Sequence, residues 1–327
     1  LGAFSTGVGS TDMAAGMATG ETWFKVPEAI RVHLTGKLQP WVSGKDVILH
    51  LIGLIGVDGA LYQSLEYCGD GVAALSMDDR LCIANMSIEA GAKNGIFPVD
   101  AITRAYLDGR VNRPYTAYEA DPDAEYARTV EIDAAEVRPT VTWGTSPDQN
   151  VFLDEAVPSP ESFPDPVERE AAERGLRYQG IAAAQKMSDV SVDYVFIGSC
   201  TNARLPDLVA AAEVLKGRRL APGVRGMVVP GSMRTRRDAE ALGLDVVFKD
   251  AGFEWRKPGC SLCLAMNEDV LESGVRCAAT TNRNFEGRMG RGSRTHLVSP
   301  ETAAASGVLG RFGTAEELDR LMPRAND

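Results

Sequence analysis

Apolar runs and amphipathic segments alternate along the last part of the chain, from Val190 to about Phe312. Hydrophobic residues at helical spacing predict a helix over 206–216, and a second helix is predicted over 232–241. Short, mostly apolar runs before, between and after these helices predict strands at Tyr194–Ile197, 226–229, 246–248 and 276–280. Alternating strands and helices are typical of an α/β domain, so this part of the chain is predicted to be one.

The first part of the chain opens with a different pattern. Residues 29–38 alternate apolar and polar side chains, which predicts a strand with one buried face. His33 falls on the polar face of that strand and is expected to be solvated. His50 lies within a predicted helix over 47–54 and is interpreted as a packing residue.

A capping-box sequence at 76–79 predicts a second helix in this part, which runs to about Ala90 and stops at Gly91. Asn85 and Glu89 are four residues apart and share one face of it. Because most of their neighbours are apolar, this helix is expected to be largely buried. Two later stretches, 107–138 and 151–168, are polar and are predicted to be irregular surface connections.

Composition narrows the possible functions. The chain has 327 residues, 44% of them hydrophobic, and a formal net charge of −11. The acidic balance argues against non-specific binding to nucleic acid or anionic membranes, and no apolar run is long enough to span a membrane. Six cysteines in a chain of this length indicate reduced thiols rather than a secreted disulfide scaffold.

Three of these thiols occupy positions where chemistry is expected. Cys200 directly follows the predicted strand Tyr194–Ile197, on a Gly-Ser turn that leads into a helix. The carboxyl ends of strands in open α/β folds bind ligands, and a helix N-terminus favours a thiolate. Cys260 and Cys263 form a C-x-x-C pair behind a Pro-Gly turn.

A C-x-x-C pair alone fits a redox pair, half of a zinc site, or two ligands of an iron–sulfur cluster. The sequence has no thioredoxin-like unit around the pair, and no second pair completes a zinc site. Three thiols without a fourth fit a cluster in which one iron has no cysteine ligand. Such an iron is able to bind substrate as a Lewis acid.

Basic residues crowd into one glycine-rich segment after the last predicted strand: Arg283, Arg288, Arg291 and Arg294. The guanidinium group is a fixed fork of donors that suits a carboxylate. The segment is therefore predicted to bind an anion. Arg291 and Arg294 are interpreted as loop or interface residues.

Four motifs in order resemble the aconitase superfamily: GSCTNAR at 198–204, VVPGS at 228–232, AGFEWRKPGCSLCLAMN at 251–267, and TTNRNFEGRMGRGSRTHLVSP at 280–300. Within it, PGCSLC and NRNFEGR are most similar to the large-subunit family of isopropylmalate isomerases (3-isopropylmalate dehydratases). The similarity runs from Leu1 to near Phe312. It implies α/β architecture with aconitase-like three-layer domains.

The resemblance also implies roles for individual residues. It implies a [4Fe-4S] cluster with one open iron, held by Cys200, Cys260 and Cys263. The other expected site residues are Asn85 and Asn282 beside the cluster, Glu89 as a catalytic group, and Arg283 and Arg288 on the substrate carboxylates. Cys68, Cys82 and Cys277 match no cluster position and are expected to be inert, and His296 is interpreted as structural.

The implied activity is that of a hydro-lyase that dehydrates and rehydrates an anionic hydroxy-dicarboxylate. The expected reaction converts 2-isopropylmalate to 3-isopropylmalate in leucine biosynthesis. Homoaconitase or a related malate-type isomerase is the alternative in the same class. An RNA-binding regulator that has lost its cluster is the alternative in another class, which the acidic charge disfavours, and a third is an inert fragment without cluster.

In this family a swivelling domain, a separate small subunit in isopropylmalate isomerases, supplies the base serine. A further N-terminal part supplies a His and an Asp. The chain is therefore expected to be a shortened form that is catalytically incomplete alone. Its expected location is the cytoplasm, with an organelle as the alternative. Its predicted parts are a remnant of the first domain at 1–27, a middle domain at 28–118, a connecting segment at 119–189, and a cluster-binding domain at 190–327.

Overall fold

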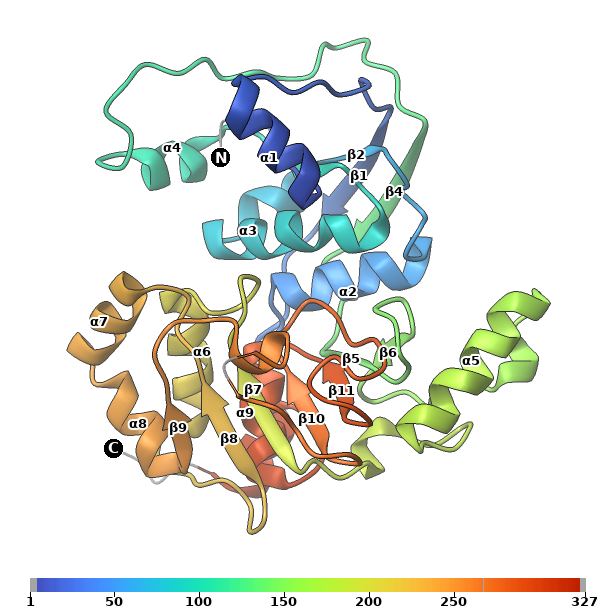
Figure 1. Cartoon of the computed structure of the whole chain (residues 1–327), viewed down its shortest axis with the longest axis vertical. Coiled ribbons are helices and arrows are strands. Elements are labelled where there is room, and N and C mark those ends of the chain that lie inside the picture. Colours follow the sequence, from blue (N-terminus) through green and yellow to red (C-terminus); the bar gives the residue numbers. More distant parts are fainter. Residues whose placement is uncertain (1–4, 267, 324–327) are drawn as a thin grey trace. The chain divides into compact units, whose positions relative to one another are not determined.

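The structure is a computed structural model that describes residues 5–266 and 268–323 (Figure 1). The chain divides into two compact units. Unit 1 comprises Leu1–Leu38 and Ile55–Glu136, and unit 2 comprises Gln39–Leu54 and Val137–Asp327. The chain thus leaves unit 1 after Leu38, returns to it at Ile55, and leaves it again after Glu136.

Unit 1 contains a parallel sheet in the order β3-β2-β1-β4. Its strands are β1 (Ala29–Thr35), β2 (Ser64–Cys68), β3 (Asn94–Ile96) and β4 (Arg128–Asp133). The predicted alternation in β1 is confirmed, and His33 lies on its polar face, where it pairs with Glu131 of β4. The interpretation of 107–138 as irregular was wrong over β4. This edge strand buries only Ile132, so it carries almost no hydrophobic signal.

The helical elements of unit 1 are α1 (Ser10–Thr19), η1 (Asp70–Ala74), α3 (Met77–Met86), η2 (Ser87–Ala90) and α4 (Ala101–Leu107). The capping box at the start of α3 is confirmed: the Ser76 side chain accepts from the Asp79 N–H, and Asp79 accepts from the Ser76 N–H. The helix stops at Gly91, as predicted, but its last turn is the 3₁₀-helix η2. Asn85 therefore lies on α3 and Glu89 on η2.

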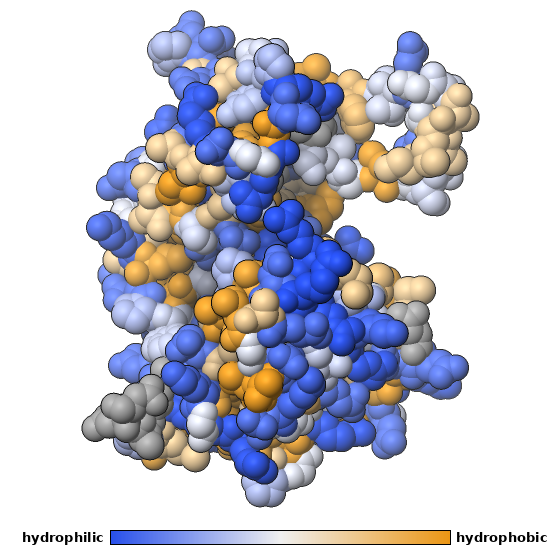
Figure 2. Space-filling model, turned by 90° about the vertical axis from the view of Figure 1, so that its left-hand side faces the viewer, coloured by the Kyte–Doolittle hydropathy of each residue, from blue (hydrophilic) through white to orange (hydrophobic). Residues whose placement is uncertain are grey.

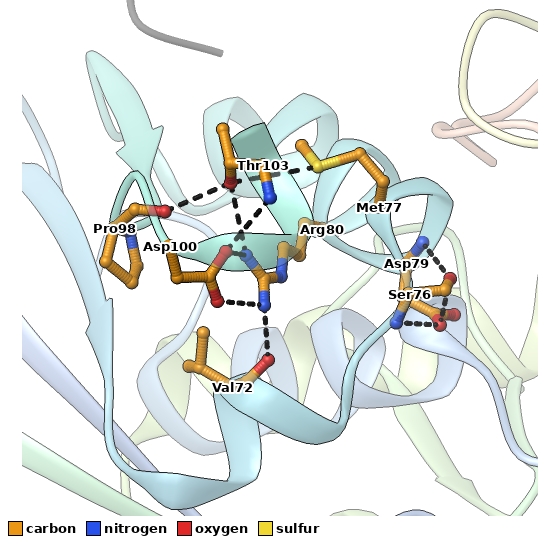
Figure 3. A network of polar contacts seen from close by, with 8 residues as sticks. All are labelled: Val72, Ser76, Met77, Asp79, Arg80, Pro98, Asp100 and Thr103. Carbon is orange, nitrogen blue, oxygen red and sulfur yellow. Dashed lines mark hydrogen bonds and ion pairs between the residues drawn. The ribbon is translucent and has the colours of Figure 1, made fainter. Parts of the chain in front are cut away.

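A buried ion pair ties α3 to the start of α4 (Figure 3). The Arg80 side chain is fully buried, and both of its terminal nitrogens donate to the Asp100 carboxylate, at 2.8 and 2.7 Å. Arg80 also donates to the Val72 carbonyl, and Asp100 caps α4 by accepting from the Thr103 N–H. The guanidinium lowers the pKa of Asp100 to about 2.

Unit 2 contains a five-stranded parallel sheet in the order β11-β10-β7-β8-β9. Its strands are β7 (Tyr194–Ile197), β8 (Arg225–Val228), β9 (Phe253–Trp255), β10 (Arg276–Ala279) and β11 (Arg294–Leu297). Three predicted strands correspond to β7, β8 and β10, so the α/β class is confirmed. The strand predicted at 246–248 was wrong. These residues lie in helix α8 (Leu244–Ala251), which buries Leu244, Phe248 and Ala251 at helical spacing.

The two faces of this sheet are covered differently. One face is formed by Val195, Ile197, Val228 and Ala278. Helices α6 (Leu205–Leu215), α8 and α9 (Pro300–Leu309) pack on it (Figure 1). The opposite face, which includes Phe196 and Met227, packs against Leu262, Cys263, Leu271 and Met289 from long loops. The helical elements of unit 2 are α2 (Gly44–Ile55), η3 (Pro160–Ser162), α5 (Pro166–Gln179), η4 (Met187–Asp189), α6 (Leu205–Leu215), α7 (Met233–Ala241), α8 (Leu244–Ala251), η5 (Ser261–Cys263), α9 (Pro300–Leu309) and α10 (Ala315–Leu321).

A short antiparallel hairpin of β5 (Thr140–Thr142) and β6 (Asn150–Phe152) completes unit 2. On the face drawn in Figure 2, hydrophobic side chains occur in small patches among hydrophilic ones. Within the described residues, none of the helices combines the length and apolar character that a membrane span requires.

The Arg80–Asp100 pair makes a testable prediction. Because the pKa of Asp100 in the folded chain lies below that of an ordinary aspartate, about 3.9, the ionised carboxylate stabilises the fold above that pH, and the contribution is lost as pH falls toward 2. We expect Asp100→Asn to lower the free energy of unfolding at pH 7 by about 2 kcal/mol. The deficit relative to wild type should shrink between pH 4 and pH 2, as measured by urea unfolding at several pH values.

The matched control is Asp238→Asn, because Asp238 forms only an exposed i,i+4 pair with Arg234 in α7. Its effect should stay below about 0.5 kcal/mol at every pH. A deficit for Asp100→Asn that does not change with pH would contradict the assignment.

Candidate functional site

The first thiol lies where β7 ends. After Ile197 the chain turns through Gly198 and Ser199 and then enters α6. Ser199 has a φ of +83°, a strained left-handed conformation for a residue with a side chain. The turn leaves Cys200 exposed. The strand–turn–helix arrangement predicted around this cysteine is confirmed.

The second and third thiols lie on the loop that follows β9. Cys260 is exposed, whereas Cys263 is buried on η5 against the sheet. Ser261, between them, also has a positive φ, of +48°. Its hydroxyl donates to Asp269 at 2.7 Å, and Asp269 in turn pairs with Arg256. The C-x-x-C turn is thus held in its strained shape by a partly buried hydroxyl–carboxylate contact.

Ser199 connects the two loops. Its hydroxyl lies 3.9 Å from the Cys200 Sγ and 3.7 Å from the Cys263 Sγ, so two of the three thiols approach the same oxygen. Cys260 lies three residues before Cys263 on the same loop, and its place beside the other two thiols stays a prediction. In the described ranges, no three His, Cys, Asp or Glu side chains converge as ligands of a single metal ion.

Arg288 approaches the Cys263 thiol from the loop that follows β10. It is buried, and its Nη2 lies 3.6 Å from the Cys263 Sγ. Its guanidinium also lies over the Phe285 ring, 5.1 Å from the centroid. Within the described part of the chain, its Nε is buried without a hydrogen-bond partner. A buried, unsatisfied cationic donor beside a thiol suits an anionic ligand.

Asn282 and Arg283 precede Arg288 on this loop, half-buried and exposed respectively. The Arg283 carbonyl accepts from the Thr281 hydroxyl. Asn284 anchors the loop because its buried amide donates to the Thr142 hydroxyl and the Gly144 carbonyl of the β5 region. Asn284 thus anchors the loop between the exposed Arg283 and the buried Arg288.

The remaining predicted site residues, Asn85 and Glu89, belong to unit 1. Both are half-buried. Asn85 lines a cavity of about 230 Å³ together with Ser5, Thr6, Gly7, Ala84, Ile88, Lys93 and Asn94. Their proposed roles stay predictions.

His296 and the other cysteines behave as structural residues. The buried His296 ring contacts the Thr142 carbonyl through Nδ1 and the Arg276 guanidinium through Nε2, at 2.7 and 2.8 Å. Because a carbonyl only accepts and a guanidinium only donates, the ring is neutral with its proton on Nδ1. Burial lowers the pKa of His296 to about 3. Burial also raises the pKa of the Cys277 and Cys68 thiols, which keeps them protonated.

The sequence did not single out three residues that organise the site: Ser199, Asp269 and Lys45. Ser199 and Asp269 act through short contacts that no spacing rule anticipates. Lys45 lies just before the helix predicted over 47–54, and no role was predicted for it. Its side chain is fully buried, which is rare for lysine and visible only in the structure.

The thiols fit an iron–sulfur cluster better than a single ion. Cys200, Cys260 and Cys263 form no disulfide within the described residues, and a cubane binds each cysteine at a separate iron, so their sulfurs need not meet at one point. The unsatisfied Arg288 Nε adds positive charge where thiolates would gather. Both cysteine loops and the arginine loop follow the carboxyl ends of strands β7, β9 and β10, which belong to the same parallel sheet.

Comparisons with known proteins found a similar sequence and a similar structure. The chain is 50% identical over 319 residues to a 3-isopropylmalate dehydratase large subunit of Clostridium kluyveri, covering 97% of this chain and 69% of that protein. Among solved structures, the holo-form of aconitase X from Thermococcus kodakaraensis is similar with a TM-score of 0.42 and 12% identity, over 90% of this chain and 54% of that one.

Residues 1–310 match the aconitase family (aconitate hydratase). The match spans almost the whole chain and includes both cysteine loops and the arginine loop. The chain therefore belongs to the aconitase family of hydro-lyase enzymes.

Proposed function

We propose that this chain is the core of an iron–sulfur hydro-lyase that interconverts 2-isopropylmalate and 3-isopropylmalate. The observation that carries the proposal is the approach of the Cys200 and Cys263 thiols to the Ser199 hydroxyl, with the buried Arg288 guanidinium against Cys263. The 50% identity to a 3-isopropylmalate dehydratase large subunit supports the substrate. Leucine biosynthesis is the corresponding pathway.

In this proposal Cys200, Cys260 and Cys263 hold a [4Fe-4S] cluster. When bound, the cluster would supply a Lewis-acidic iron for the substrate hydroxyl. The strained turns at Ser199 and Ser261 fix the cysteine backbones in advance, which reduces the ordering needed when the group binds. Asn282 and Asn85 would donate hydrogen bonds beside the cluster.

Arg283 and Arg288 would bind the two carboxylates of the substrate. Arg288 is held inward by Phe285 and Cys263, so its open donor would orient one carboxylate. Arg283, which is exposed, would take the second. Glu89 would move a proton at the carbon or hydroxyl of the substrate, as general acid–base catalysis requires.

The expected partner is a small subunit, because the Clostridium relative is named a large subunit. We propose that this small subunit carries the swivelling domain. The division at 1–27, 28–118, 119–189 and 190–327 remains our proposal for domain boundaries within the longer family architecture. The alternative function is that of a homoaconitase. Assays of each acid with the chain supplemented by a small subunit and the further N-terminal part would distinguish the two functions.

Replacing Cys200, Cys260 or Cys263 individually by Ser tests the ligand set. After anaerobic reconstitution, each variant is expected to lose the visible absorbance of the cluster and most of its bound iron, because each thiolate would hold a separate iron. The matched control is Cys68→Ser, a half-buried thiol on β2. Full absorbance in any of the three variants, or its loss in the control, contradicts the assignment.

Replacing Arg283 or Arg288 by Lys tests the carboxylate site. Lys keeps the charge but loses the bidentate fork, so the dissociation constant for 3-isopropylmalate should rise about 10- to 100-fold. Isothermal titration of the reconstituted chain measures this, with cluster absorbance recorded in parallel. Arg291→Lys, an exposed residue of the same loop, is the control, and an equal loss there would mean that only general charge matters.

A further inference from the structure

Lys45 lies near the start of α2, and its side chain is fully buried in unit 2. Lysine is almost never buried to this extent unless its charge is satisfied. The Lys45 Nζ donates to the Asn202 Oδ1 at 3.3 Å, the Thr280 carbonyl at 3.0 Å and the Thr281 carbonyl at 2.6 Å. These three acceptors are uncharged.

The acceptors come from two different loops. Asn202 is two residues beyond Cys200, on the turn between β7 and α6. Thr280 and Thr281 follow β10 and lead directly into Asn282 and Arg283. One ammonium group therefore joins the thiol loop to the arginine loop.

The residues that Lys45 contacts form further hydrogen bonds within unit 2. The Asn202 amide donates to Asp207 at 3.0 Å, and Asp207 also accepts from the Arg204 N–H, which starts α6. On the other side, the Thr280 hydroxyl accepts from the Gly198 N–H at 2.9 Å. The Thr280 hydroxyl also donates to the Asn202 carbonyl at 3.5 Å. These contacts of Thr280 do not need Lys45, so the amine adds a separate connection between the loops.

From these contacts we infer that Lys45 is a positioning residue that sets the spacing between the cysteine loop at 198–204 and the arginine loop at 280–288. The inference rests on the proposed function only in one respect, which is that the two loops are taken to hold the cluster and the substrate. An ammonium group is suited to this task because its three donors diverge from one point, whereas a carboxylate or amide side chain could not donate to three acceptors.

Hydrogen exchange of the full chain without cluster tests the inference directly. Lys45→Met keeps the length of the side chain and removes the donors, which leaves three buried acceptors unsatisfied. Exchange should become about tenfold faster in both the 198–204 and 280–288 loops, with β8 unchanged. Lys249→Met, which removes an exposed pair with Asp245, is the control and should change neither loop. No change in Lys45→Met, or a uniform change across unit 2, overturns the inference.

Asn202→Ala provides a second test that does not remove the buried charge. It deletes one acceptor, while Lys45 still contacts the Thr280 and Thr281 carbonyls. Exchange should rise at 198–204 and stay slow at 280–288. A rise in both loops or in neither would show that Lys45 does not act through Asn202 as described.

Cluster retention gives the functional readout. In reconstituted Lys45→Met, iron should pass to a chelator about 10- to 100-fold faster than in wild type, as expected for residues that orient metal ligands. A wild-type chain that binds no cluster contradicts the proposed function, while the exchange experiment still decides the role of Lys45. A cluster equally stable in both proteins contradicts the inference alone.

Discussion

The arrangement of this site depends on one constraint, which is that the strands of the unit 2 sheet are parallel. Parallel strands present their carboxyl ends at one edge, so the segments that follow them emerge together. Cys200 follows β7, the C-x-x-C pair follows β9, and the arginine loop follows β10. Residues separated by more than 80 positions in the sequence are thereby placed at the same edge before any side chain makes a contact.

The unequal covering of the two sheet faces complements this constraint. Helices pack on one face through regular apolar surfaces, while loops pack on the other through Leu262, Cys263 and Met289. A loop that packs in this way is not free to move, and it holds Cys263 under Arg288 and beside Ser199. The strained backbones of Ser199 and Ser261 are maintained by these surroundings.

Much of the fold was predictable because it has strong local signals. β7 is a buried run of four apolar residues, and Ser76 and Thr314 cap helices through contacts that sequence rules describe. The two wrong predictions of secondary structure have physical causes. β4 is a polar edge strand, and 246–248 has strand-like composition but buries one face of a helix.

The candidate site was predictable only in part. The positions of Cys200, Cys260, Cys263 and the arginines follow from motifs, since motifs are contiguous in sequence. The contacts of Lys45 with Asn202 and Thr281 join positions 157 and 236 residues apart, and no local pattern encodes them. Similarly, the hydroxyl of Ser199 connects two thiols only after the sheet has formed.

The most direct test of the account is crystallography of the anaerobically reconstituted chain at the iron absorption edge. Because the three cysteines are proposed to bind one cluster, the account predicts a single compact peak of anomalous density that contacts the Sγ atoms of Cys200, Cys260 and Cys263. Iron density at any other position, or density that contacts only one of these sulfurs, would contradict it.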